Sequence, residues 1–244
     1  MSLLTAGASR FGNDDGSADP AVTAALAAFA GGTGTEHAAL TALAASRLLV
    51  PLVAALADEA AVPDAAAQGA GGSCGGEKSS EVALPALVGK DGRRAVPAFT
   101  SLAALTRWRP GARLVPALAS AVWDAAVQDG CAVVIDVAGP VPLAVEGARL
   151  AALASGEPVP WPHQDPDVLA AVTAAAAQQP VPPGIELAPG EADGELVIRL
   201  ALPAGSPPSA AAELAAAIGA GVMASLGGRL RQGLSFEVTR AGSG

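Results

Sequence analysis

The chain has no tyrosine, two histidines and two cysteines among its 244 residues, and aromatic side chains make up only 3% of it. These are side chains from which proteins build zinc sites, disulfide frameworks and many acid–base catalysts. Neither His37 nor His163 is spaced from the other, or from Cys74 or Cys131, as zinc ligands are. We therefore expect no metal, no cofactor and no disulfide scaffold. Cys131 opens an apolar run and is expected to be a buried, inert thiol.

Positive charge is also scarce, because 14 lysines and arginines face 23 aspartates and glutamates, which gives a formal net charge of −9. Nucleic acids and anionic membranes are bound through clustered positive charge, so neither is expected as a partner. The first ten residues lack the basic start and apolar core of a signal peptide. The apolar stretch 214–228 is shorter than the roughly 18 residues needed to cross a bilayer. These features predict a soluble, cytoplasmic protein. Prolines at positions 51, 85, 97 and 116, within or beside candidate strands, would blunt open sheet edges, so a monomer or small oligomer is expected.

Apolar residues are plentiful, at 51% of the chain, although many of them are alanine. This fraction is enough for a real core. Apolar spacing and capping residues predict helices, and short apolar runs between turn signals predict strands. The expected helices begin after Asp19, Thr35 and Thr100 or Ser101, and others span 120–129, 148–154, 167–178 and 209–226. The expected strands are 47–53, a hairpin around 89–92, and 114–116, 132–137, 143–145, 185–187, 195–202 and 234–239.

This mixture predicts an α+β fold, with a mixed sheet and packed helices followed by a smaller α+β unit. Composition divides the chain into a flexible tail at 1–18, a first domain at 19–155, a proline-rich linker at 156–166 and a small second domain at 167–240. Within the first domain, residues 57–80 are expected to form a mobile loop. Pro51 favours an edge position for the strand 47–53.

No catalytic constellation emerges from the motifs. Residues 72–79 resemble a phosphate-binding loop, but Glu77 stands where a glycine must precede the lysine. Residues 233–237 approach a nucleophile elbow and lack its last glycine. Asp165 and Asp167 are expected to cap a helix rather than to form a carboxylate pair. A non-catalytic binding or regulatory protein is therefore the leading hypothesis.

Two alternatives stay open. One is a small-molecule sensor or enzyme with a site at the junction of the two domains, to which Trp161, His163 and Asp136 are candidate contributors. The other is a protein-interaction module that uses the basic segment 90–113. Its candidate interaction surface comprises Arg93, Arg94, Arg107, Arg109 and Arg113. A well-solvated turn and helix end would explain the same arginines.

Two tryptophans are expected to matter for stability. Trp108 and Trp123 fall on the apolar faces of their predicted helices, in a core otherwise made of small side chains. Each ring should therefore fill space that no neighbour can fill.

Several segments of residues 20–155 resemble the N-terminal domain of the SseB family. They include residues 77–84, the Asp-Gly-Arg-Arg turn at 91–94 with the Pro-Ala-Phe-Thr-Ser stretch at 97–101, and also 47–51, 112–116 and 134–140. The sequence is most similar to the high-GC actinobacterial branch, and it departs from the family pattern at Val137, where proline is usual. The resemblance implies a cytoplasmic protein of a family named for enhanced serine sensitivity, with no agreed enzymatic activity or catalytic residues to carry over.

Overall fold

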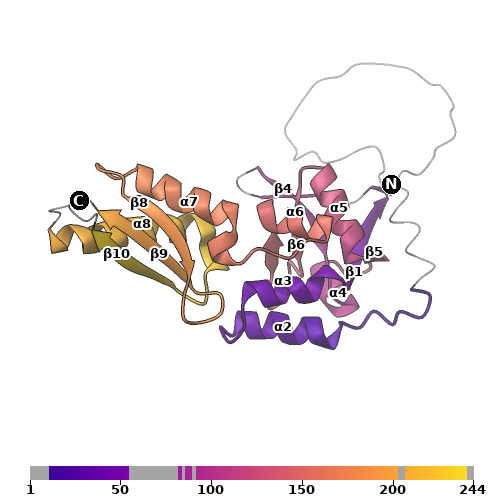
Figure 1. Ribbon diagram of the computed structural model, residues 1–244. Helices are drawn as coiled ribbons and strands as arrows, with labels where there is room; N and C mark the ends of the chain where they lie inside the picture. The colour runs from indigo at the N-terminus through magenta and orange to yellow at the C-terminus, as the bar shows by residue number, and fades with distance from the viewer. Residues whose placement is uncertain (1–10, 55–81, 84–85, 90–91, 203–206, 241–244) are drawn as a thin grey trace, which may run out of the picture.

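The computed structural model describes residues 11–54, 82–83, 86–89, 92–202 and 207–240. The expected mobile loop at 57–80, which includes Cys74, lies outside these residues. The described chain forms two lobes, which lie side by side in Figure 1. We call the described residues within 11–155 the first lobe and those within 166–240 the second lobe. Helices pack against mixed sheets in both, which confirms the predicted α+β fold.

The first lobe follows the predicted order of elements closely. Its helices are α2 (Pro20–Ala30), α3 (Glu36–Ala44), α4 (Leu102–Trp108), α5 (Ala119–Gln128) and α6 (Gly147–Ser155). Its strands are β1 (Arg47–Ala54), β2 (Val82–Ala83), β3 (Leu87–Val88), β4 (Arg94–Ala98), β5 (Arg113–Leu118), β6 (Ala132–Ile135) and β7 (Leu143–Val145). Asp19, Thr35 and Ser101 cap the first three helices as expected, because each side-chain oxygen accepts a backbone N–H of the first turn.

The strands of the first lobe form two sheets. One has the order β2-β1-β5 and is antiparallel, and the other has the order β3-β4-β6-β7, in which β4 and β6 run parallel. The expected hairpin is present, since Leu87 pairs with Ala95. Leu49 and Phe99 exchange both backbone hydrogen bonds, at 2.7 and 2.9 Å, and so join the two sheets.

The expected edge position of β1 is wrong, because β1 lies between β2 and β5. Pro51 is tolerated there for a local reason. Backbone groups of a strand point alternately to its two sides, so Pro51 faces the same side as Leu49. On that side β1 bonds to Phe99 at Leu49 and pairs with β2 from Val53, so Pro51 falls between these contacts. The missing N–H therefore breaks no ladder bond to β5.

Residues 1–10 of the expected flexible tail lie outside the described residues, whereas residues 11–18 are bound to the rest of the first lobe. The Asp14 carboxylate forms an ion pair with Arg47 at 2.7 Å, and both side chains are largely buried. The backbone N–H of Leu102 donates to the carbonyl of Gly16 at 2.7 Å. Asp14 and Asp15 also accept backbone N–H groups two residues ahead of them, which is turn chemistry that composition alone does not distinguish from flexibility.

The core of the first lobe lies between the β4–β6–β7 face and the helices α2, α3, α5 and α6. Trp123 is completely buried there. Trp108 is only partly buried and packs against Phe99, with ring centroids 5.3 Å apart, in a smaller cluster under α4. Cys131 is buried, as predicted, and its thiol donates to the carbonyl of Asp129 at 3.4 Å.

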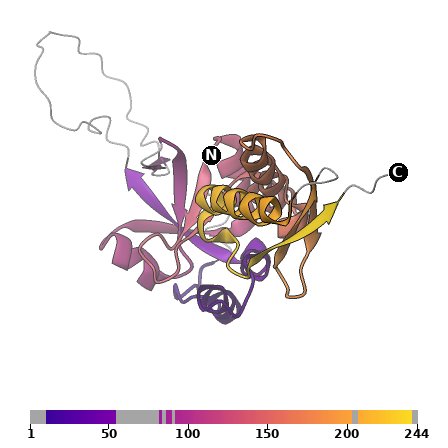
Figure 2. The same cartoon turned by 90° about the vertical axis from the view of Figure 1, so that its left-hand side faces the viewer.

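The second lobe is a three-stranded sheet covered on one face by two helices. It contains α7 (Pro166–Ala177), β8 (Gly184–Pro189), β9 (Leu196–Leu202), α8 (Pro208–Leu226), the short 3-10 helix η2 (Gly227–Arg229) and β10 (Leu234–Arg240). The strand order is β10-β9-β8, with β9 and β10 parallel. Helices α7 and α8 pack side by side on the face formed by Leu196, Ile198 and Leu200 (Figure 2).

Helix α8 is longer than the apolar stretch expected from the sequence. Its residues Ser209–Leu226 are long and apolar enough to cross a membrane by length and composition, and 17% of this stretch is buried in the fold. Ile218, Val222 and Leu226 form its buried stripe against the sheet. A single helix of this kind is weak evidence, so the stretch alone does not indicate a membrane span.

The segment expected to be a linker, 156–166, packs against the first lobe at Val159 and Trp161. Gly156 ends α6 in a left-handed conformation, Val159 is buried in the core of the first lobe, and the Trp161 ring stacks on His37 with centroids 3.8 Å apart. A short 3-10 helix, η1 (Pro162–Gln164), then leads to Asp165, which caps α7. This segment therefore brings the second lobe against the start of α3.

Candidate functional site: a charged cavity between the lobes

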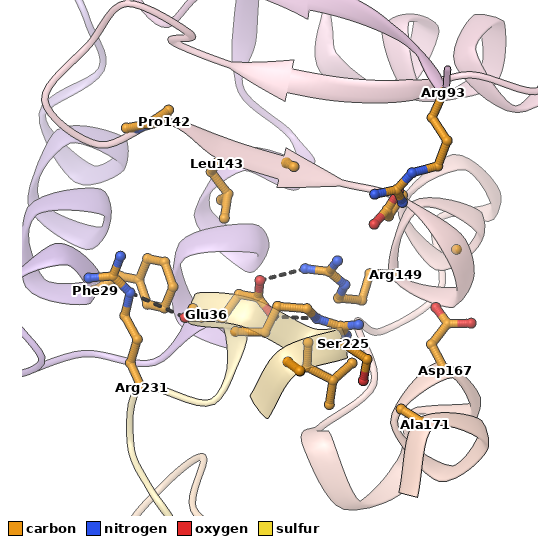
Figure 3. Close-up of a pocket in the computed structure, with 17 residues that line it drawn as sticks. Phe29, Glu36, Arg93, Pro142, Leu143, Arg149, Asp167, Ala171, Ser225 and Arg231 are labelled. Atoms are coloured by element: carbon orange, nitrogen blue, oxygen red, sulfur yellow. Dashed lines mark hydrogen bonds and ion pairs between the residues drawn. The ribbon is translucent and has the colours of Figure 1, made fainter. Parts of the chain in front are cut away.

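A cavity of about 700 Å³ lies between the two lobes. Its wall comes from α2, α3, the β7 region and α6 on one side, and from α7, α8 and the segment after α8 on the other (Figure 3). The charged side chains of this wall are Glu36, Arg93, Glu146, Arg149, Asp167, Arg229 and Arg231. Cavities at the junction of two units, with a few convergent polar groups, are common sites for small ligands.

A buried charged cluster forms the centre of the cavity wall. Arg149 donates to Glu36 at 2.5 Å, although the two residues come from different helices, and its side chain is only 2% exposed. Arg229 of the second lobe lies 3.6 Å from the other Glu36 oxygen and donates to Asp165 at 2.5 Å. Figure 3 shows Glu36 with Arg149 beside it. The cluster thus links α3 and α6 to η2.

Burial is the largest cause of the pKa shifts of Glu36 and Arg149 in this cluster. It raises the pKa of the Glu36 carboxyl, even though Arg149 and Arg229 favour the ionised form. It also lowers the pKa of the Arg149 guanidinium, against the attraction of Glu36. The Nε atoms of Arg149 and Arg229 are buried and have no hydrogen-bond partner in the part of the chain that is described. A buried N–H group without a hydrogen-bond acceptor lowers the stability of the folded protein.

The two ends of the cavity differ in the charge around them. Near α6, Arg93 pairs with Glu146 at 2.6 Å, and Asp167 accepts the backbone N–H of Ala148 at 2.8 Å. At the other end, Arg231 donates to the carbonyls of Gly228 and Ala30, and its guanidinium lies 4.9 Å from the centre of the Phe29 ring.

Asp167 caps α6 from the other lobe, and this contact requires a glycine. Gly147 has a φ of +60°, and a Cβ there would overlap the Asp167 carboxylate. We expect Gly147→Ala to destabilise the protein by about 2 to 4 kcal/mol, through backbone strain and steric conflict together. The measurement is the midpoint of urea unfolding.

Gly156→Ala is the matched control for this prediction. Gly156 has a φ of +72° at the other end of the same helix, and a Cβ added there would meet no described atom within 4 Å. Gly156→Ala should therefore lower the free energy of unfolding by about 1 kcal/mol, through backbone strain alone. Equal losses of stability in the two variants would show that the steric conflict with Asp167 does not contribute to the effect of Gly147→Ala.

None of the three junction residues suggested by the sequence lies on the described wall of this cavity. Trp161 is at the junction but stacks on His37. His163 lies in η1. Asp136 follows β6 inside the first lobe and binds Thr100. Within the described residues, no group of three or more histidine, cysteine, aspartate or glutamate side chains is placed to hold a metal ion.

Asp136 is a buried carboxyl in a left-handed backbone conformation, with φ of +47°. Its two oxygens accept the backbone N–H of Thr100 at 2.9 Å and the Thr100 hydroxyl at 2.6 Å. Burial raises the pKa of this carboxyl above 3.8, against the hydrogen bonds from Thr100. The folded protein therefore holds this proton more tightly than the unfolded chain does, and the associated stability is lost as pH rises through that window.

Asp136→Asn is expected to retain full stability or gain some at pH 7. Asparagine can bond both Thr100 groups, tolerates positive φ and carries no buried charge. The advantage of the variant should shrink as pH falls below the raised pKa of Asp136, which urea unfolding at a series of pH values measures. Asp136→Ala should instead cost about 1 to 3 kcal/mol, because Thr100 loses its acceptors. If the difference in free energy of unfolding between wild type and Asp136→Asn were the same at all pH values, the predicted effect of the Asp136 charge would be contradicted.

The arginines of the basic segment are not all at one place. Arg93 and Arg94 lie at the start of β4, next to Ala95, which pairs with the first residue of β6. Arg107, in the last turn of α4, interacts with Asp136, which follows the last residue of β6. Arg93 and Arg107 therefore lie toward opposite ends of the parallel pair β4 and β6. Arg109 caps α4 and Arg113 begins β5, and the interaction surface made of all five stays a prediction.

Of the residues that line the cavity, sequence reasoning named Arg93, in a candidate interaction surface, and Asp167, as a helix cap, and missed the others. Asp165 does cap α7, as predicted, but it also binds Arg229, and Asp167 caps a different helix from its own. A signal was present for Arg149, because it stands four residues before the buried Leu153 and so lies on the apolar stripe of α6. An arginine in such a stripe indicates a buried ion pair.

The fold and the cavity define a two-lobed α+β protein whose lobes meet at a charged junction. The family model described as the SseB protein N-terminal domain matches residues 22–152 of the chain. The chain therefore belongs to the SseB family, which confirms the resemblance seen in the sequence. No curated protein and no solved structure matches it.

Proposed function

We propose that this SseB-family protein is a non-catalytic, cytoplasmic binding protein that takes a small polar molecule into the junction cavity. One observation carries the proposal: both lobes contribute charged side chains to one cavity of about 700 Å³. Among them is Arg231, an exposed guanidinium that has only main-chain carbonyls as hydrogen-bond acceptors in the described chain. A polar ligand would give such groups partners, and it would contact both lobes at once.

The side chains around the cavity support binding rather than turnover. In its described wall Ser225 is the only hydroxyl side chain, and there is no histidine, cysteine or lysine. The Ser225 hydroxyl donates to the carbonyl of Val222 at 3.1 Å, so no base activates it there. Nucleophilic catalysis needs a nucleophile held against a base, and the wall offers no such pair.

A thermal-shift screen of a library of polar metabolites tests the proposal. We expect some compounds to raise the Tm of the wild type and of Ala217→Phe, but not that of Ala224→Phe. Both alanines are exposed on α8, but only Ala224 lines the cavity, so its replacement by phenylalanine fills the binding space. The proposal fails if no compound raises the Tm, or if Ala224→Phe responds as the wild type does. Mass spectrometry of the hits would overturn the non-catalytic part if any were consumed.

A further inference from the structure

We infer that the ligand of the junction cavity is an elongated zwitterion with a cationic group at one end and an anionic group at the other, such as a short peptide with free termini. The inference rests on the proposed function and adds the chemical class of the ligand. It follows from how the charges of the cavity wall are distributed, and from which of them already have partners.

The end of the cavity at the N-terminus of α6 carries an excess of negative charge, since Arg149 of that helix pairs with Glu36 in the central cluster. Two carboxylates, Glu146 and Asp167, face one guanidinium, that of Arg93. Arg93 pairs with Glu146. Asp167 binds a backbone N–H, but in the described chain no cationic side chain pairs with it. An ammonium group of a ligand would supply the missing cationic partner of Asp167 at this end of the cavity.

The other end carries an excess of positive charge. The guanidinium group there is that of Arg231, because Arg149 and Arg229 belong to the central cluster, where they pair with Glu36 and Asp165. In the described part of the chain Arg231 has only main-chain carbonyls as hydrogen-bond acceptors and forms no ion pair. A guanidinium binds a carboxylate through two parallel hydrogen bonds, so this end suits an anionic group.

The separation of the two ends sets the shape of the ligand. Figure 3 shows Asp167 and Arg231 on opposite sides of the Glu36 cluster, with Leu143 and Ala171 also lining the space. A single small anion would satisfy only the arginine end and leave the carboxylate end without a partner. A molecule with a neutral middle and opposite charges at its ends matches the whole wall.

Isothermal titration calorimetry of the full chain with unblocked di-, tri- and tetraalanine tests the inference. We expect at least one length to bind. Its N-acetylated form and its C-terminal amide should each bind about tenfold more weakly or worse, because each loses one charged contact. Inorganic phosphate should not compete. Equal binding of the acetylated and unblocked peptides, or competition by phosphate alone, would show that the ligand is an anion and would overturn the inference.

Two variants test which charged group of the peptide binds at which end of the cavity. Asp167→Asn removes the negative charge but keeps an acceptor for Ala148, and it should abolish the discrimination against the acetylated peptide only. Arg231→Gln should abolish the discrimination against the amide only. Glu191→Gln, an exposed carboxylate away from the cavity wall, is the matched control and should bind as the wild type does. Unchanged discrimination in both cavity variants would also overturn the inference.

The failure of this inference can be told apart from failure of the proposed function. If no peptide of the series binds while the metabolite screen gives hits that Ala224→Phe loses, the cavity binds a ligand of another class. If the screen gives no hit either, the proposed function fails with it.

Discussion

Trp123→Ala is expected to lower the free energy of unfolding by about 3 to 5 kcal/mol, the cost of opening a large cavity in a core. Trp123 is the largest of the fully buried side chains, with 0% of its surface exposed. Its neighbours in the core include Ala98, Ala119, Ala126 and several valines, which are too small to close the space that the ring leaves. The indole N–H has no hydrogen-bond partner in the described structure, so its contribution comes from packing. Urea unfolding followed by circular dichroism measures the loss.

Trp108→Ala is the internal control for this prediction. Trp108 is only partly buried and packs at the edge of the small cluster around Phe99. Its loss should therefore cost less than the loss of Trp123, since the free energy of truncation follows the area and the cavity removed. Equal costs, or an unchanged unfolding midpoint for Trp123→Ala, would contradict the burial that distinguishes the two rings.

The helices and strands could be predicted because their signals are local. Asp19, Thr35 and Ser101 bond to backbone groups two or three residues away, and the apolar spacing that marks α2 or α5 lies within a few turns. The sheet order depends on contacts between distant segments. Pro51 could therefore be assigned to a strand from the sequence, but its place between the bridge at Leu49 and the pairing of Val53 with β2 could not.

A site at the junction of the two halves was one of the alternatives, but most of its residues were beyond sequence reasoning for the same physical reason. Glu36 and Arg149 are 113 residues apart in the chain, and Arg229 and Asp165 are 64 apart. No spacing rule links residues at such distances, since only the packing of the two lobes brings them together. The composition indicates that side chains of catalytic types are scarce, and the absence of catalysis stays a prediction.

Arg149→Met is expected to destabilise the protein by about 3 to 5 kcal/mol, the usual cost of leaving one partner of a buried ion pair without the other. The variant would keep Glu36 buried, with Arg229 at 3.6 Å as its remaining cation, and that guanidinium already pairs with Asp165. Methionine fills much of the space of the arginine stem, so the loss would report charge rather than volume. The double variant Glu36→Gln, Arg149→Met should recover most of the stability, because it removes both charges. A thermodynamic cycle of the four proteins by urea unfolding measures this coupling.

The pH dependence of the Arg149→Met deficit separates charge from packing. Burial raises the pKa of Glu36 in the folded wild type, and the loss of Arg149 removes one of the groups that oppose this rise, so the pKa should be higher still in the variant. A carboxyl with a raised folded-state pKa binds its proton more tightly in the folded protein, and stability is lost as pH rises from the unfolded value of 4.5 through the folded one. The deficit of Arg149→Met should therefore shrink as pH falls through this range, because protonation of Glu36 neutralises the unpaired charge. In the double variant this part of the pH dependence should vanish. A deficit that stays constant with pH would mean that Arg149 stabilises the junction through its packing alone.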